Sequence, residues 1–119
     1  MKKVFPGSVL LSLMLVSASA SAGSNTGFTQ VAQIGFASSG IVKVWFPVGS
    51  VTGIPACVPA SNVGNEYAFV FDSTSPAGKS LLAGLLEVHS AGIPVWLFGS
   101  GACDVLTGFE TVASFNTQN

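Results

Sequence analysis

The sequence has 119 residues, of which four are Lys or Arg and five are Asp or Glu, so its formal net charge is −1. A nucleic-acid-binding surface needs a cluster of cations that displaces counterions from the phosphates. So few cations exclude nucleic acid as the expected partner.

The chain begins with the three parts of a secretory signal. Lys2 and Lys3 form a basic start, an apolar stretch follows over 9–16, and the small residues Ala-Ser-Ala end at Ala22. The apolar stretch is too short for a permanent membrane-spanning helix, so no membrane span is expected. We expect cleavage after Ala22, with cleavage after Ala20 as the second choice.

This signal divides the chain into residues 1–22, the signal peptide, and residues 23–119, one small domain of fewer than a hundred residues. The protein is expected to be secreted or periplasmic. In the remaining domain Lys43 and Lys79 are the only Lys or Arg side chains, and the five carboxylates make it mildly acidic.

Two strands are predicted first. Residues 28–36 alternate, with Phe28 and Phe36 on one face, and a Ser-Ser-Gly turn ends the strand. Residues 41–48 alternate as well, with Val44 on the face opposite to Trp45.

A long connection and a third strand follow. Residues 49–65 have no period and are rich in Gly, Pro, Ser and Asn, which predicts a long loop that contains Cys57. Residues 66–72 alternate again and form the third strand.

The next segment contains Gly-Lys-Ser at 78–80, the ending of a phosphate-binding loop. Such a loop needs a glycine where this chain has Ser73, and Pro76 removes one of the amides that would hold a phosphate. The motif therefore fails as a nucleotide site, and no cofactor is expected.

A helix explains the same residues better. Ser75 is a good N-cap and Pro76 suits the first helical position. Leucines recur at helical spacing over 81–86, and Gly92 is placed to end the helix.

Two further strands complete the domain. In 95–98, Trp96 and Phe98 alternate with Val95 and Leu97, and a Gly-Ser-Gly turn follows. Alternation over 109–115 predicts the fifth strand.

The element order is therefore three strands, one helix and two strands. This is the order of the OB-fold, a five-stranded Greek-key barrel with its helix between the third and fourth strands, so we predict a mainly β fold of this kind. An open sheet with a helix on one face is the competing architecture.

The two cysteines, Cys57 and Cys103, are predicted to form a disulfide, because an even pair in a small exported domain is typically oxidised. It would stabilise the fold by about 4 kcal/mol on the chain-entropy model. A metal site is not expected, because the chain has one histidine and no C-x-x-C motif.

The stretch "YAFVFDSTSPAGKSLLAGLLEVHSAGIPVWLFGSGAC", residues 67–103, carries a resemblance to a known group. Together with the signal peptide, the strand order and the positions of the cysteines, it resembles the receptor-binding B subunits of bacterial toxins, in particular those of subtilase cytotoxin and typhoid toxin. The resemblance implies a ring-forming, glycan-binding subunit without enzymatic activity. It assigns no sugar-contacting residue to a position of this chain.

Four residues are candidates for a binding or interface surface. If Val44 faces the interior, Trp45 points outward, and the same alternation places Trp96 and Phe98 outward. Exposed tryptophans mark a protein interface or a surface on which a ligand stacks, whereas the opposite register would bury both in the core. Lys43, beside Trp45, could orient a polar ligand or be a solvated edge charge.

No catalytic site is expected. The lone His89 has neither a nucleophile nor an orienting carboxylate on its own helix face. The Gly-Ser-Gly at 99–101 is a turn and lacks the pattern of a nucleophile elbow.

The function predicted from these residues is that of an exported, non-catalytic binding subunit. It would recognise a glycan or a secreted protein and assemble into a homo-oligomer. The alternative is a monomeric periplasmic interaction protein, such as an enzyme inhibitor that uses the loop 49–65. A small secreted hydrolase is a third class.

Overall fold

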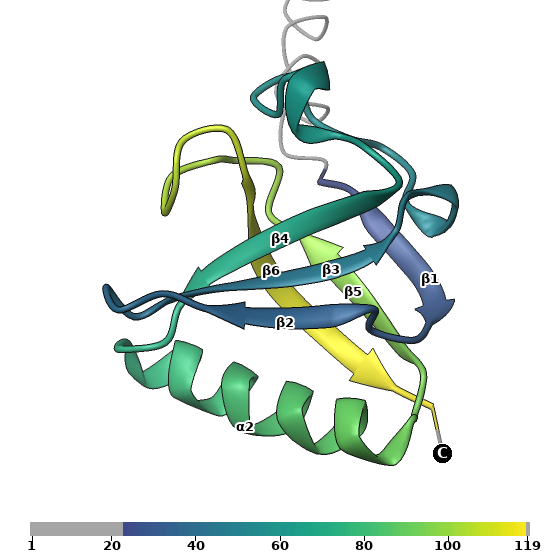
Figure 1. Ribbon diagram of the computed structural model, residues 1–119, viewed down its shortest axis with the longest axis vertical. Coiled ribbons are helices and arrows are strands. Elements are labelled where there is room, and N and C mark those ends of the chain that lie inside the picture. The colour runs from purple at the N-terminus through teal and green to yellow at the C-terminus, as the bar shows by residue number, and fades with distance from the viewer. Residues whose placement is uncertain (1–22, 119) are drawn as a thin grey trace, which may run out of the picture.

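The computed structural model describes residues 23–118; the predicted signal peptide, residues 1–22, and Asn119 lie outside the described residues. The described part contains six strands, one α-helix and two short 3-10 turns (Figure 1). The strands are β1 (Asn25–Thr29), β2 (Gln33–Phe36), β3 (Ile41–Pro47), β4 (Glu66–Asp72), β5 (Val95–Gly99) and β6 (Glu110–Thr117). The helix is α2 (Pro76–Ala91), and the turns η3 (Val48–Ser50) and η4 (Ala60–Asn62) lie in the connection after β3.

The strands form one sheet in the order β1-β5-β6-β4-β3-β2. Neighbouring strands are antiparallel, except β4 and β6, which run parallel. Figure 1 shows a strongly twisted sheet with helix α2 lying across its lower end. The predicted class, mainly β with one helix, is confirmed.

The number of strands differs from the prediction, because the sheet has six strands and is open, whereas five strands in a closed barrel were expected. The predicted strand 28–36 is divided into β1, which pairs with β5, and β2, which pairs with β3. Residues 30–32 join the two, and the buried side chain of Val31 lies in the join. The alternation in the sequence continues through residues 30–32. It therefore does not indicate that the chain changes there from pairing with β5 to pairing with β3.

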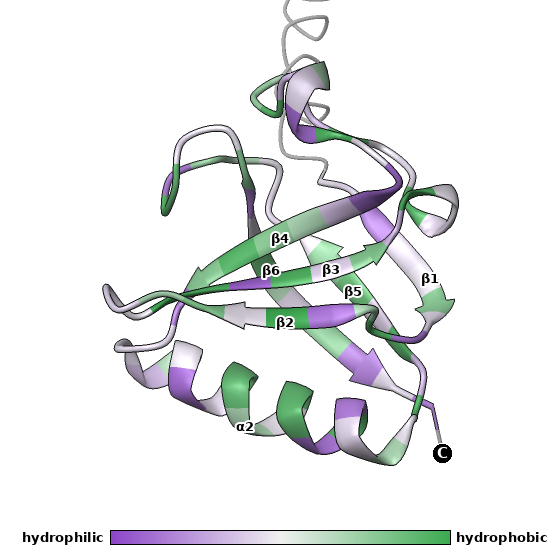
Figure 2. Ribbon diagram, viewed as in Figure 1, coloured by the Kyte–Doolittle hydropathy of each residue, from purple (hydrophilic) through white to green (hydrophobic). Residues whose placement is uncertain are grey.

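The core lies between the inner faces of the strands and helix α2. Its fully buried apolar and aromatic side chains are Val44, Phe46, Tyr67, Phe69, Leu85, Val95 and Leu97. The ring of Phe69 meets those of Phe46 and Tyr67 edge to face, with centroids 5.9 and 4.9 Å apart. In Figure 2 the hydrophobic colour is concentrated along β3, β4 and the middle turns of α2. Burial of these hydrophobic residues is the main contribution to the stability of the fold.

Helix α2 begins where the sequence predicts. The side chain of Ser75 accepts a hydrogen bond from the amide of Gly78, at 2.9 Å, and Pro76 is the first helical residue. Gly92 ends the helix with a left-handed backbone, φ 69°. The amide of Gly78 is thus used by the helix cap, which confirms the reading of Gly-Lys-Ser as a helix start.

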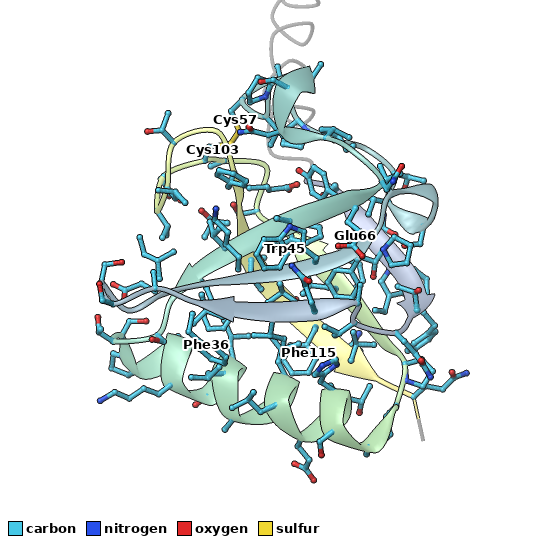
Figure 3. All side chains as sticks on the ribbon, viewed as in Figure 1. Phe36, Trp45, Cys57, Glu66, Cys103 and Phe115 are labelled. Carbon is cyan, nitrogen blue, oxygen red and sulfur yellow. A yellow bond between two sulfur atoms is a disulfide. The ribbon has the colours of Figure 1, made fainter. Side chains whose placement is uncertain are left out.

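The predicted disulfide between Cys57 and Cys103 is confirmed. Their Cα atoms are 6.0 Å apart, and the bond joins the connection after β3 to the loop after β5 (Figure 3). The same two segments are joined a second time, because the side-chain amide of Asn62 donates to the carbonyl of Gly108 at 2.9 Å. The two longest loops of the described chain are therefore fastened to each other.

A carboxylate lies inside the fold, at the start of β6. Glu110 is fully buried; its Oε2 accepts hydrogen bonds from the amides of Ser24 and Gly101, each at 3.0 Å. Its Oε1 accepts from the hydroxyls of Ser24 and Tyr67, the latter at 2.8 Å. Space for the carboxylate exists because position 99 is glycine: a Cβ there would overlap Oε2.

Burial raises the pKa of the Tyr67 hydroxyl well above its ordinary value, and the hydrogen bond to Glu110 and the negative charge of that carboxylate raise it further. Tyr67 therefore keeps its proton and remains a donor to Glu110 over the whole physiological pH range.

Candidate binding site

The four predicted surface residues lie on the outer face of the sheet. Val44 and Leu97 are fully buried, whereas Trp45 and Trp96 are partly exposed. The tryptophans therefore face away from the core, and the alternative in which both are core residues does not describe this fold.

The structure separates these residues into two groups. Lys43 and Trp45 are on β3, whereas Trp96 and Phe98 are on β5, and β6 and β4 lie between those strands in the sheet. No shared site for both tryptophans is formed, so each group needs its own account.

Lys43 and Trp45 line a pocket of about 330 Å³ on the outer face of β2 and β3. The pocket is lined by Gly35, Phe36, Ala37, Ser39, Ile41, Lys43, Trp45 and Leu106. Phe36 is 63 % exposed at its rim, and Figure 3 shows this ring between β2 and helix α2. Among these lining residues Lys43 is the one whose side chain carries a charge, and we call this hollow the Lys43 pocket.

The wall formed by Trp45 depends on a glycine in the neighbouring strand. A Cβ at position 35 would lie 2.9 Å from Cζ3 of the indole, closer than real contacts allow. Gly35 therefore lets the indole lie against the backbone of β2, because no side chain stands between them. The register of β2 and β3 sets this arrangement, because Gly35 pairs with Lys43 and Gln33 pairs with Trp45.

The ammonium of Lys43 is held by aromatic rings. Its Nζ lies 4.3 Å from the ring centroid of Phe109 and 6.0 Å from that of Trp45. Cation–π contacts at such distances contribute about 0.5–1 kcal/mol at exposed sites. Lys43 is therefore positioned at the pocket and not simply a solvated edge charge.

The loop between β5 and β6 contributes one residue, Leu106, to the lining. Leu106 lines the pocket and pairs in an isolated bridge with Phe109, and Cys103 lies three residues before Leu106. On the neighbouring strand β4, Val70 pairs with Lys43 and is fully buried. Because the disulfide anchors this loop, it also supports one wall of the pocket.

A carboxylate, Asp72, lies across the strands from Ile41, one of the residues that line the Lys43 pocket. Asp72 pairs with Ile41 across the strands, and it accepts hydrogen bonds from the hydroxyl and the amide of Thr74 at 2.6 and 2.9 Å. These two hydrogen bonds lower the pKa of Asp72 below its ordinary value. Asp72 is therefore the neighbour of one lining residue, Ile41, and Lys43 is the charged residue of the lining itself.

Trp96 and Phe98 belong to a second group, the β1–β5 aromatic cluster of Phe28, Trp96 and Phe98. The rings of Trp96 and Phe98 are stacked with centroids 5.7 Å apart, and Phe28, 45 % exposed, meets Trp96 edge to face at 5.2 Å. The indole Nε1 donates to Oδ1 of Asn25 at 3.1 Å. The cluster is a partly exposed aromatic surface whose indole N–H already has a hydrogen-bond acceptor.

Several residues of these surfaces were missed by sequence reasoning. Phe109, Leu106 and Phe36 join Lys43, and Phe28 joins Trp96, only through pairings between distant segments. Local alternation identifies an outward residue but not its neighbours on the next strand. The one local sign of the pocket in the sequence is Gly35, because a glycine inside a strand suggests that another group approaches the backbone closely.

Among residues 23–118, no three His, Cys, Asp or Glu side chains are grouped as metal ligands. None of the helices formed by these residues is long and apolar enough to cross a bilayer. The chain matches no family model, and no curated protein or solved structure matches it either.

Proposed function

We propose that this chain is an exported, non-catalytic binding subunit that holds a glycan in the Lys43 pocket and assembles with copies of itself. The observation that carries the proposal is the pocket itself: an indole, an ammonium positioned by aromatic rings and a serine lie around about 330 Å³. Ligand pockets of proteins span about 300–1,000 Å³ and combine apolar walls with a few placed polar groups.

The chemistry of the walls favours a sugar over a flat apolar ligand. The C–H face of a pyranose ring stacks on an aromatic face such as that of Trp45, while its hydroxyls need polar partners at the edge of the ring. Lys43 can donate hydrogen bonds to such hydroxyls, and Ser39 can donate or accept. The volume suits one sugar ring, with any further rings in solvent.

We also propose that the sheet is a variant of the OB-fold barrel, as the resemblance to toxin B subunits implies. In this proposal β1 and β2 are the two halves of one bent first strand, because only residues 30–32 separate them and they occupy the two ends of the sheet order. The parallel pairing of β4 with β6 agrees with a Greek-key arrangement.

For self-association, the β1–β5 aromatic cluster is the surface that we favour. Aromatic residues are enriched at protein interfaces, and rings already locked against each other lose little freedom when a partner covers them. Light scattering on the processed protein should report an oligomer, and Phe28→Ser should shift it toward the monomer. A monomer at micromolar concentration would contradict the assembly.

The alternative, a monomeric inhibitor that presents residues 49–65, is supported by one observation. Between η3 and β4 this segment is fastened by the disulfide and by the hydrogen bond from Asn62 to Gly108, as inhibitory loops need to be. An inhibitor would lose its activity on substitutions in this loop and not on Trp45→Ala.

The glycan proposal is tested on a glycan array with three proteins. The wild type should bind a defined set of glycans, Trp45→Ala should lose at least tenfold in affinity, and Trp96→Ala should bind as the wild type does. Trp96→Ala is the matched control because it removes the same side chain from the other surface. Equal losses in both variants, or no binding by the wild type, would remove the proposal.

A further inference from the structure

The buried carboxylate of Glu110 takes no part in the binding surfaces, and its charge has no obvious partner among the side chains around it. Its four donors are two backbone amides and two neutral hydroxyls. Of the two lysines in the described residues, Lys43 lies against Phe109 on the outer face, and Lys79 is exposed on helix α2. Buried charges are normally paired as well as hydrogen-bonded, because removing them from water is costly.

The segment that contacts Glu110 is the first one after the predicted signal peptide. Ser24 is 1 % exposed; its amide and hydroxyl both donate to Glu110, and its carbonyl accepts from the amide of Gly99 at 2.8 Å. Terminal residues are normally frayed unless something holds them. Here the chain is held from its first described residues onward.

Gly23 lies directly against the same turn. A Cβ at position 23 would overlap the carbonyl of Gly99 and would lie 2.8 Å from the amide nitrogen of Gly101. That amide in turn donates to Oε2 of Glu110. Only a residue without a side chain fits at this position.

The nitrogen of Gly23 precedes the amide of Ser24 by one residue, a step of about 3.8 Å at most, and that amide is 3.0 Å from Oε2. The nitrogen of Gly23 therefore lies within about 7 Å of the carboxylate. In the precursor this nitrogen belongs to a neutral peptide bond. In a chain that begins at Gly23 it is a primary ammonium.

We infer that Glu110 is the binding site for the protein's own processed amino terminus. Cleavage after Ala22 creates an ammonium on Gly23 that pairs with the buried carboxylate, so the processed chain is more stable than any chain with a longer amino terminus. Charge-assisted hydrogen bonds of this kind are stronger than neutral ones, and a poorly hydrated site strengthens them further. The inference rests on the proposed export of the protein, since that step supplies the cleavage.

The site also distinguishes between the two predicted cleavage positions. Cleavage after Ala20 would leave Ser21 and Ala22 in front of Gly23 and move the ammonium two residues away from Glu110. The protein should therefore be exported with its own signal, purified and weighed by mass spectrometry. A mass that begins at Gly23 is expected; any other amino terminus would overturn the inference, and an unprocessed chain would overturn the export proposal as well.

The charge itself is tested on the processed protein. Transamination converts an amino-terminal glycine into a glyoxylyl group, which removes the ammonium, keeps the size and spares both lysines. In the wild type this change should lower the equilibrium constant for folding at least tenfold in urea titrations. In Glu110→Gln the same change should alter it less than twofold.

Equal effects in the two proteins, or no effect in the wild type, would overturn the inference while leaving export intact. If Glu110→Gln does not fold, the inference is tested on the wild type alone, through the reactivity of its α-amine. The α-amine should react with an acylating reagent at least tenfold more slowly in the folded protein than in urea. Similar rates in both states would show that the amine is free in solution and would overturn the inference.

Discussion

At the scale of single residues, several glycines mark places where another group occupies the space of a side chain. Gly78 is the sharpest case, because its Cβ would overlap the carbonyl of Asp72 at the end of β4. The residue that imitates a phosphate-binding motif is therefore explained by close packing of the helix start on the preceding strand.

Gly78→Ala should consequently destabilise the protein despite the better helix propensity of alanine. We expect the free energy of unfolding to fall by about 1–3 kcal/mol, because the backbone of Asp72 cannot easily move away. The matched control is Gly49→Ala, where a Cβ would meet nothing within 4 Å and the change should stay within about 0.5 kcal/mol. Urea titrations that give the same midpoint for both variants would contradict the close contact.

Tyr67 predicts how stability depends on alkaline pH. An unfolded tyrosine loses its proton near pH 10, whereas folded Tyr67 keeps its proton because its pKa is raised. The unfolded state therefore releases a proton that the folded state retains, and stability falls as the pH rises above about 10. In Tyr67→Phe this fall should be shallower; an identical pH dependence in both proteins would show that another group is responsible.

At the scale of elements, the helix was predicted well because its signals are local. Ser75, Pro76 and Gly92 act through contacts within a few residues of themselves, so their roles can be read from the sequence and are confirmed in α2. The division of the first strand could not be predicted, because β1 is placed by β5, about seventy residues later.

The cap of α2 gives a direct test at this scale. Ser75→Ala removes the acceptor for the amide of Gly78 and should cost about 1 kcal/mol of stability. Ser80→Ala, an exposed serine one turn into the same helix, should be neutral or slightly stabilising because alanine is the better helix former. Thermal melts that rank the two variants in the opposite order would contradict the capping role.

At the scale of the whole molecule, the sequence predicted the class, the disulfide and the outward direction of both tryptophans. It did not predict the Lys43 pocket, because its lining comes from β2, β3 and the loop before β6, and only the tertiary fold brings Leu106 to Trp45. The same is true of Glu110, whose partners Ser24 and Tyr67 are 86 and 43 residues away.

The disulfide should matter for both stability and binding. It closes a loop over a sequence separation of 46, for which the chain-entropy model gives about 4 kcal/mol. Reduction should therefore lower the urea midpoint strongly and, at low denaturant, weaken the proposed glycan binding, because the wall with Leu106 loses its anchor. Binding that survives reduction in folded protein would separate the pocket from the disulfide.

The position of β1 in the sheet has a consequence for biogenesis. A chain that crosses a membrane from its amino terminus delivers Phe28 first, yet the strand that receives it, around Trp96, arrives near the end. The earliest segment to emerge must wait for almost the last one, and such distant pairings form slowly. If the chain is exported as proposed, Ser24 has no partner during that interval, so a signal peptidase would meet an unfolded substrate and the fold would close over the new amino terminus afterwards.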